Sequence, residues 1–220
     1  MPLKRAPAAV VFDLDGVLLD TEPLYTQATQ EIVGEYGKVF DWSVKAKTIG
    51  RGDVDSAGVL IRELDLPFEP REYLARRNGR LRELFVDVAA IPGAPEFVQA
   101  LHERRIPCAV ATSSSKELFE LKTRKHAFID LFDVVVCGND PAVKRPKPAP
   151  DIFLHAARRL GVTPAACLVL EDAPAGVEAA VAAGMQVVAM PDPHVDRAEV
   201  ARADLIVSGY ADFALADLGL

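Results

Sequence analysis

Residues 10–17 read VVFDLDGV, an apolar run that ends in two acids, Asp13 and Asp15, and a glycine, Gly16. The apolar part predicts a strand buried on both faces of a sheet. Two carboxylates at the end of such a strand are costly unless a cation or strong hydrogen bonds satisfy them, and Mg²⁺ prefers carboxylate and carbonyl oxygens. Gly16 would let the chain turn sharply after the acids. The stretch predicts a strand that ends in a metal site, although such an acidic pair, taken alone, more often begins an ordinary surface loop.

Short runs rich in Val, Ala, Ile and Leu recur along the rest of the chain, separated by segments with helical apolar spacing. The expected strands are 8–12, 107–112, 134–137, 167–170, 186–190 and 205–207. The expected helices between them are 95–105, 116–126, 150–160, 174–183 and 196–202. This alternation predicts an α/β fold with a Rossmann-like parallel sheet and helices on both of its faces.

One segment, residues 22–88, breaks the alternation, because it has helical periodicity and little strand character. A stretch with two prolines and a glycine, residues 91–95, then leads back to the alternating pattern. We expect a core domain made of residues 1–20 and 91–220, and a small helical cap domain made of residues 21–90. An insert directly after the first strand would lie above the C-terminal ends of the strands, where open α/β sheets bind ligands, so it is a candidate lid.

Three further motifs follow predicted strands. Thr112 and Ser113 end the second strand, where a hydroxyl, backbone N–H groups and the start of the next helix can bind phosphate oxygens. Lys147 stands between two prolines that restrict its backbone, and its ammonium can act as a point charge on a phosphate or a carboxylate. Glu171 and Asp172 form a second acidic pair at the end of another apolar strand.

Each of these motifs, taken alone, has an ordinary explanation as an N-cap, a solvated basic loop or a capping pair. Together they are more informative, because each lies at or just past the C-terminal end of a predicted strand or in the loop that feeds the next helix. Their chemistry is also complementary: carboxylates suit a metal and a nucleophile, while a hydroxyl and a lysine suit phosphate. The combination predicts one site for phosphoryl chemistry.

The chain has 220 residues and a formal net charge of −7, without a basic cluster that would indicate a nucleic-acid partner. No apolar run approaches the ~20 residues needed to span a bilayer. The three cysteines, Cys108, Cys137 and Cys167, each fall in an apolar run and form no CxxC pair. We therefore expect buried free thiols in a cytoplasmic protein that has neither nucleic acid nor a membrane as a partner.

Four stretches resemble the signature motifs of the haloacid dehalogenase-like superfamily: residues 12–22 (FDLDGVLLDTE), 112–114 (TSS), 147–151 (KPAPD) and 170–172 (LED). The helical insert resembles the small cap of that superfamily. Residues 40–47, 121–126, 138–141 and 171–180 are similar to its GS1-like branch, which includes pseudouridine-5′-phosphatase and glycerol-3-phosphatases. The resemblance implies a Mg²⁺-dependent phosphatase for a small phosphorylated metabolite, that is, a sugar, polyol or nucleoside phosphate. A monomer is expected for this branch.

The resemblance also implies a role for each motif residue. Asp13 would be the nucleophile that becomes an aspartyl phosphate, and Asp15 would be the acid that protonates the leaving group and then the base that activates water. The residues that would bind the phosphoryl oxygens are Thr112, Ser113 and Lys147, and Lys147 would also steady Asp13. The ligands of Mg²⁺ would be Asp13, the backbone carbonyl of Asp15 and Asp172, with Glu171 in or near the metal shell.

The cap is expected to contact the leaving group and thereby to select the substrate. Its polar candidates are Glu22, Tyr25, Lys45, Lys47 and Arg51. Arg51 lies between two glycines, which would let a loop present it to a ligand, although an exposed arginine in a turn fits the same pattern.

Three other functions share parts of this pattern. Phosphomutases such as β-phosphoglucomutase carry the same motifs, but they have a cap-side histidine near the start of the insert, where this chain has Tyr25. A haloacid dehalogenase proper does not need the second acid of the first motif, so Asp15 argues against it. The third alternative is a non-catalytic binding module, because a fold alone does not secure activity. Against that alternative, none of the expected catalytic residues is missing.

Overall fold

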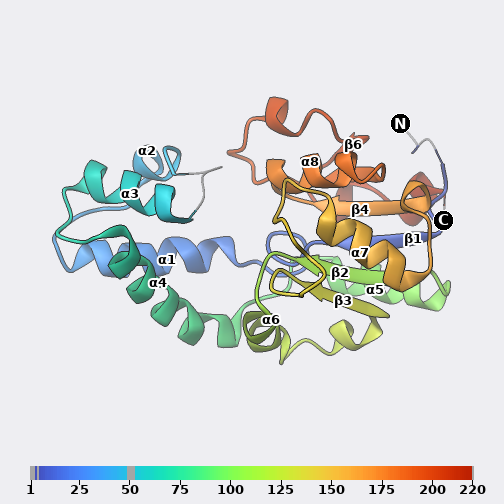
Figure 1. Cartoon of the computed structure of the whole chain (residues 1–220), viewed down its shortest axis with the longest axis horizontal. Coiled ribbons are helices and arrows are strands. Elements are labelled where there is room, and N and C mark those ends of the chain that lie inside the picture. Colours follow the sequence, from blue (N-terminus) through green and yellow to red (C-terminus); the bar gives the residue numbers. More distant parts are fainter. Residues whose placement is uncertain (1–2, 4, 49–52, 220) are drawn as a thin grey trace. The chain divides into compact units, whose positions relative to one another are not determined.

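The computed structural model of the chain describes residue 3, residues 5–48 and residues 53–219. Six strands form one sheet in the order β3-β2-β1-β4-β5-β6, and all neighbouring strands are parallel (Figure 1). The strands are β1 (Ala9–Phe12), β2 (Cys108–Thr112), β3 (Val134–Cys137), β4 (Cys167–Glu171), β5 (Gln186–Ala189) and β6 (Leu205–Ile206). The predicted α/β fold with a parallel sheet is confirmed.

Helices cover both faces of this sheet. On one face, Phe97 of α5 (Ala94–Glu103) packs edge-on against Phe12 of β1, with ring centroids 6.3 Å apart. On the other face, buried residues of α7 (Asp151–Leu160) and α8 (Pro174–Ala182) form one apolar core with β1, β2, β4 and β5. Both faces of the strands are therefore removed from water, which explains why the strands read as continuous apolar runs.

The remaining elements of this part of the chain are short. Helix α6 (Lys116–Thr123) follows β2. The helix predicted at residues 196–202 is wrong as an α-helix: the structure has a short 3₁₀ turn, η4 (Arg197–Val200), capped by the Asp196 side chain, and the chain then bonds to β5 at Asp204. The other 3₁₀ turns here are η2 (Ala127–Leu131), η3 (Pro164–Ala166), η5 (Tyr210–Asp212) and η6 (Leu215–Leu218).

The strand order brings the predicted motifs to one edge of the sheet. In the centre, Phe12 of β1 lies opposite Val110 of β2 on one side and Leu170 of β4 on the other. The chain builds outward from β1 to β3 and then returns to β4, so the order reverses between β1 and β4. A crevice at the carboxyl ends of the strands, at such a reversal, is where open α/β sheets bind their ligands.

Residues Thr21–Val88 form a second compact unit, separate from the unit made of Met1–Asp20 and Ala89–Leu220. Its own apolar core includes Val33, Leu60 and Tyr73. Its helices are α1 (Glu22–Gly34), α2 (Trp42–Lys45), α3 (Asp53–Leu64) and α4 (Pro70–Leu84), followed by the 3₁₀ turn η1 (Phe85–Asp87). Across the ranges that the structure describes, no helix has both the length and the apolar character needed to cross a membrane.

The loop after β2 leaves no room for a side chain at Gly138, because a Cβ atom there would lie 2.3 Å from the Ser113 carbonyl oxygen. We expect Gly138→Ala to lower the free energy of unfolding by about 1–3 kcal/mol, as overpacking usually does. Urea denaturation measures this change. The matched control is Gly209→Ala in the same unit, where a Cβ would meet nothing within 4 Å, and a change within about 0.5 kcal/mol is expected. Equal effects of the two substitutions would contradict the close approach at Gly138.

Candidate active site

The centre of the site is the ammonium group of Lys147, which contacts three oxygens. Its Nζ donates to Asp13 Oδ1 at 2.5 Å, to Glu171 Oε1 at 2.6 Å and to the carbonyl oxygen of Ala111 at 3.2 Å. The side chains of all three charged residues are at most 10% exposed. A buried charge is stable only when it is paired and hydrogen-bonded, and this arrangement satisfies both requirements for Lys147.

The loop that carries Lys147 is held at both sides. Arg145, two residues before it, donates from its backbone N–H and its guanidinium to the Asp151 carboxylate, at 3.1 and 2.7 Å. Asp151 is the first residue of α7, and Phe153 of the same helix places its ring 4.9 Å from the Lys147 ammonium. The three prolines of this loop limit its backbone freedom, as the sequence predicts. The loop and α7 together fix where the ammonium lies.

Asp13 follows β1 directly, and its N–H donates to the Leu170 carbonyl of β4 at 3.0 Å, so its backbone extends the sheet. Its second carboxylate oxygen, Oδ2, accepts a hydrogen bond from the Asp15 N–H at 2.9 Å. Burial raises the pKa of Asp13 to about 7, against the opposing charge of Lys147 and with a further rise from Glu171 and Asp15. For Lys147, burial alone would lower the pKa, but the carboxylates of Asp13 and Glu171 raise it above the ordinary lysine value.

Asp172 lies against the turn that follows Asp15. Gly16 adopts a left-handed backbone with φ of +75°, and a Cβ atom there would lie 2.2 Å from Asp172 Oδ2. Only glycine therefore combines this conformation with this contact. Burial, and then the nearby carboxylates of Glu171 and Asp13, raise the pKa of Asp172 well above its ordinary value.

The donor set around Asp13 and Asp172 fits a divalent cation. Burial, with a further contribution from neighbouring carboxylates, raises the pKa values of both groups, and Mg²⁺ is held by one or two carboxylates together with carbonyl, water and phosphate oxygens. Within the described residues, no three acidic, histidine or cysteine side chains come close enough to hold a metal by themselves. The other oxygens that commonly complete a Mg²⁺ site are those of carbonyl groups, water and phosphate.

Glu171, which the sequence analysis places among the metal ligands, has other contacts in the structure. Its Oε1 accepts from Lys147, while its Oε2 accepts from the backbone N–H groups of Asp172 and Ala173 at 3.0 Å each. Its side chain is 1% exposed, and a Cβ atom on Gly176 of α8 would lie 1.7 Å from Oε1. Both oxygens are thus committed to fixing Lys147 and the start of the 172–176 segment.

The predicted phosphate-binding residues lie at the end of β2. Thr112 is fully buried and its hydroxyl oxygen accepts from the Ser114 N–H at 3.0 Å, which leaves the hydroxyl proton for another acceptor. Ser113 is exposed. The backbone N–H of Gly138, after β3, donates to the Ser114 carbonyl at 2.9 Å and so fixes this loop.

Two residues of the site, Lys122 and Ser114, were assigned no role from the sequence, although Ser114 belongs to the motif at 112–114. Lys122 of α6 donates to Asp15 Oδ1 at 2.6 Å and to the Ser114 hydroxyl at 3.0 Å, and that hydroxyl donates to Asp15 Oδ2 at 3.2 Å. The signal in the sequence is a lysine on the apolar face of its helix, where Phe119 and Thr123 are also buried. A lysine in that position is unusual, because lysine is almost never fully buried unless it is paired.

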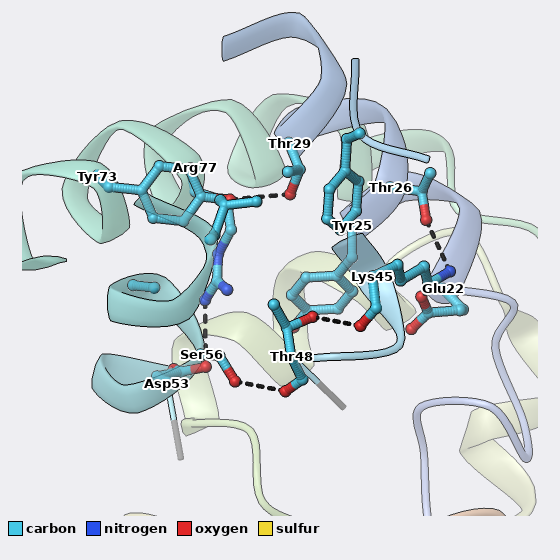
Figure 2. A pocket seen from close by; sticks show the side chains of 13 residues that line it. Glu22, Tyr25, Thr26, Thr29, Lys45, Thr48, Asp53, Ser56, Tyr73 and Arg77 are labelled. Carbon is cyan, nitrogen blue, oxygen red and sulfur yellow. Dashed lines mark hydrogen bonds and ion pairs between the residues drawn. The ribbon is translucent and has the colours of Figure 1, made fainter. Parts of the chain in front are cut away.

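Of the five candidate residues of the second unit, three line one pocket in the structure. Glu22, Tyr25 and Lys45 line one pocket of about 270 Å³, shown in Figure 2, with Lys45 Nζ 2.6 Å from Glu22 Oε1. Lys47 does not line that pocket and pairs instead with Glu63, at 2.6 Å. Arg51 lies outside the described residues.

The same pocket contains a cation that the sequence analysis did not select. The Arg77 guanidinium lies 5.6 Å from the Tyr25 ring centroid and 3.3 Å from Asp53 Oδ1. Its Nε is buried without a hydrogen-bond partner among the described residues. Figure 2 shows the Arg77 guanidinium pointing toward the Asp53 carboxylate, and a dashed line marks their ion pair. With Glu22 and Lys45, the lining therefore carries two acids and two bases.

A sequence model of haloacid dehalogenase-like hydrolases matches residues 7–184. The chain belongs to the haloacid dehalogenase-like hydrolase family. (DL)-glycerol-3-phosphatase 2 of Arabidopsis thaliana is 41% identical to it over 217 residues, which cover 96% of this chain and 90% of the relative. A probable pseudouridine-5′-phosphatase of Drosophila melanogaster is 41% identical over 214 residues, which cover 96% and 93%. The structure of a family hydrolase from Deinococcus radiodurans R1, with bound phosphate and sodium, matches with a TM-score of 0.84 at 30% identity over 98% of each chain.

The resemblance found in the motifs is thus confirmed at the level of the family, and so is the prediction that this chain is a hydrolase related to phosphatases. The motif residues of the family are also the ones that the sheet brings together around Lys147.

The raised pKa of Asp172 predicts how this hydrolase responds to pH when metal is removed. A group whose folded-state pKa exceeds its unfolded value costs stability above the unfolded value, about 4 for a carboxyl group, and the cost grows as pH rises toward the folded-state value. We expect metal-free Asp172→Asn to melt at a higher temperature than the parent at about pH 8, with a smaller difference at about pH 5. Thermal melts in chelator across this range measure the effect.

The control is Asp151→Asn, because the Arg145 side-chain hydrogen bond lowers the pKa of Asp151. Here the sign reverses: the parent's advantage is fully present above about pH 4 and is lost only as pH falls through the lowered pKa, so it should not change between about pH 5 and pH 8. A stability gain of Asp172→Asn that does not change with pH would contradict the electrostatic origin.

Proposed function

We propose that this hydrolase is a Mg²⁺-dependent phosphatase that removes phosphate from a small phosphate monoester through an aspartyl phosphate on Asp13. The observation that carries the proposal is the buried contact of the Lys147 ammonium with the carboxylates of Asp13 and Glu171. A carboxylate can attack an anionic phosphate only where positive charge is in place, and this ammonium supplies part of it. Phosphoryl transfer depends mostly on such positioning and charge neutralisation.

In the first half-reaction, an Asp13 carboxylate oxygen forms a bond to phosphorus while the bond from phosphorus to the ester oxygen breaks. The Asp15 carboxyl gives its proton to the leaving oxygen. In the second half-reaction, the Asp15 carboxylate takes a proton from water, the water oxygen bonds to phosphorus, and the bond to Asp13 breaks to release phosphate. Division into two steps makes each of them easier than direct hydrolysis.

The phosphoryl oxygens would be bound by the Thr112 hydroxyl and by the backbone N–H of Ser113, in the loop that leads into α6. Lys147 has three ammonium protons and three acceptors in the structure. To donate to a phosphoryl oxygen it must give up one of them, and the 3.2 Å bond to the Ala111 carbonyl is the longest of the three. Its permanent role is therefore to hold Asp13.

Asp13, Asp172 and the Asp15 carbonyl oxygen would hold the Mg²⁺. When bound, the ion would neutralise charge on the phosphoryl oxygens and on the two carboxylates. We assign Glu171 to positioning rather than to the metal, because its Oε2 accepts from two backbone N–H groups, its Oε1 accepts from Lys147, and its side chain is only 1% exposed.

The relatives support a substrate with a small polar leaving group, since their names specify glycerol 3-phosphate and pseudouridine 5′-phosphate. We assign the choice among such substrates to the second unit, acting as a cap, through Glu22, Tyr25 and Lys45. The two acids and two bases of their pocket balance in charge, which suits a neutral leaving group with hydroxyls better than a second phosphate.

The direct test is phosphate release from glycerol 3-phosphate, pseudouridine 5′-phosphate, 2-deoxyglucose 6-phosphate, FMN and β-glucose 1-phosphate, with Mg²⁺ and with chelator. We expect release that requires Mg²⁺ and falls by about 10³-fold or more in Asp13→Asn, which lacks the nucleophile. Conversion of β-glucose 1-phosphate to the 6-phosphate without release would indicate a phosphomutase instead. Folded protein with neither activity would overturn the proposal.

Metal binding has a readout that does not depend on turnover. Because Mg²⁺ would bind the folded state only, it should raise the melting temperature of the parent protein as its concentration rises above its Kd. Asp172→Asn loses one of two proposed carboxylate ligands, so the same Mg²⁺ series should shift its melting temperature much less. Equal shifts in the two proteins would rule out Asp172 as a ligand.

A further inference from the structure

The carboxylate of Asp15 is held from two sides by residues that the mechanism above does not use. Lys122 Nζ donates to Oδ1 at 2.6 Å, and the Ser114 hydroxyl donates to Oδ2 at 3.2 Å. Lys122 also donates to Ser114 at 3.0 Å, which closes a triangle of three side chains from three different segments. The backbone of Asp15 is fixed separately, because its N–H donates to Asp13.

The burial of Lys122 is what makes this contact unusual. Its side chain is 0% exposed, while the Asp15 side chain is 30% exposed. Removing an ammonium group from water costs several kcal/mol, and apolar replacements of buried ion pairs are often neutral or stabilising. The stability of the fold therefore gives little reason for a lysine here. The open side of the pair is the Asp15 carboxylate, at the edge of the sheet where the motifs meet.

We propose that Lys122 is a positioning residue that, with Ser114, holds the Asp15 carboxylate in the orientation required for proton transfer. This inference rests on the proposed function, because it takes Asp15 as the acid and base. An aspartate side chain that is one-third exposed has several rotamers open to it, whereas a proton donor must lie within hydrogen-bond reach of the leaving oxygen. A misplacement of about 1 Å can cost about 10²-fold in rate.

The first test compares two esters in Lys122→Met, which keeps the length of the side chain and removes the ammonium. An alkyl ester such as glycerol 3-phosphate has a poor leaving group that needs the proton, while p-nitrophenyl phosphate releases a stable phenolate. In Lys122→Met, we expect kcat/KM for the alkyl ester to fall by about 10–100-fold. For the aryl ester, we expect kcat/KM to fall by no more than a few-fold. The matched control is Lys125→Met, at an exposed lysine just beyond the same helix. This substitution should change kcat/KM for neither ester.

A double-mutant cycle separates positioning from a general structural effect. If Lys122 acts through Asp15, Lys122→Met should cause no further loss in an Asp15→Asn background, whereas independent effects would multiply. Ser114→Ala removes the other contact and should show the same preference for the aryl ester with a smaller loss. If Lys122→Met does not fold, Ser114→Ala carries the ester comparison alone.

The outcomes distinguish a failure of the role of Lys122 from a failure of the proposed phosphatase activity. The role of Lys122 would be overturned if the parent protein releases phosphate but Lys122→Met loses equal activity on both esters. It would also be overturned if the losses of Lys122→Met and Asp15→Asn multiply in the double mutant. Either result would leave the proposed phosphatase activity intact. No release by the folded parent from any ester would overturn the proposed function itself. Selective loss on the alkyl ester together with a non-additive cycle would support the positioning role.

Discussion

The contact on which the rest of the site depends is the buried ammonium of Lys147 between Asp13 and Glu171. It neutralises one of the three carboxylates that β1 and β4 bring to the same edge of the sheet, so negative charge remains in excess. Burial is the main cause of the raised pKa values of Asp13 and Asp172, and the neighbouring carboxylates raise them further. A divalent cation and an anionic substrate fit such a site together, because the cation supplies the positive charge that both the carboxylates and the phosphate require.

Two glycines make this density of carboxylates possible. A side chain at Gly16 would occupy the place of the Asp172 carboxylate, and one at Gly176 would occupy that of Glu171. The glycines belong to different segments, the turn after β1 and helix α8, and each admits an acid that comes from the end of β4. The backbone at each glycine thus lies directly against a carboxylate. This close packing holds the carboxylates of Asp172 and Glu171 in place.

Much of the fold and most of the residues of the candidate site could be predicted from the sequence, because the sequence signals for them are local. Apolar runs that end in charge, such as the one before Asp13, mark both a buried strand and its functional end. Lys122 was missed because its meaning depends on a partner 107 residues away, and helical periodicity alone describes it as a misplaced polar residue. The hydrogen bond from Lys147 to Glu171 is equally invisible in sequence, since it depends on how the loop of Lys147 packs against β4. The expected helix at 196–202 is a 3₁₀ turn at 197–200, and Asp204, four residues after the turn, already exchanges hydrogen bonds with Val187 of β5.

The two acids of the first motif are therefore controlled by two different lysines. Asp13 is nearly buried and is held by Lys147, from the loop before α7, while the more exposed Asp15 is held by Lys122, from α6. Carboxylates two residues apart repel each other, and a single cation between them would pull both toward the same point. In the proposed mechanism, separate ammonium groups on separate elements would instead let one carboxylate face the phosphorus atom and the other face the leaving oxygen. The proposed roles of nucleophile and acid–base residue would then follow from which element supplies the counter-charge of each carboxylate.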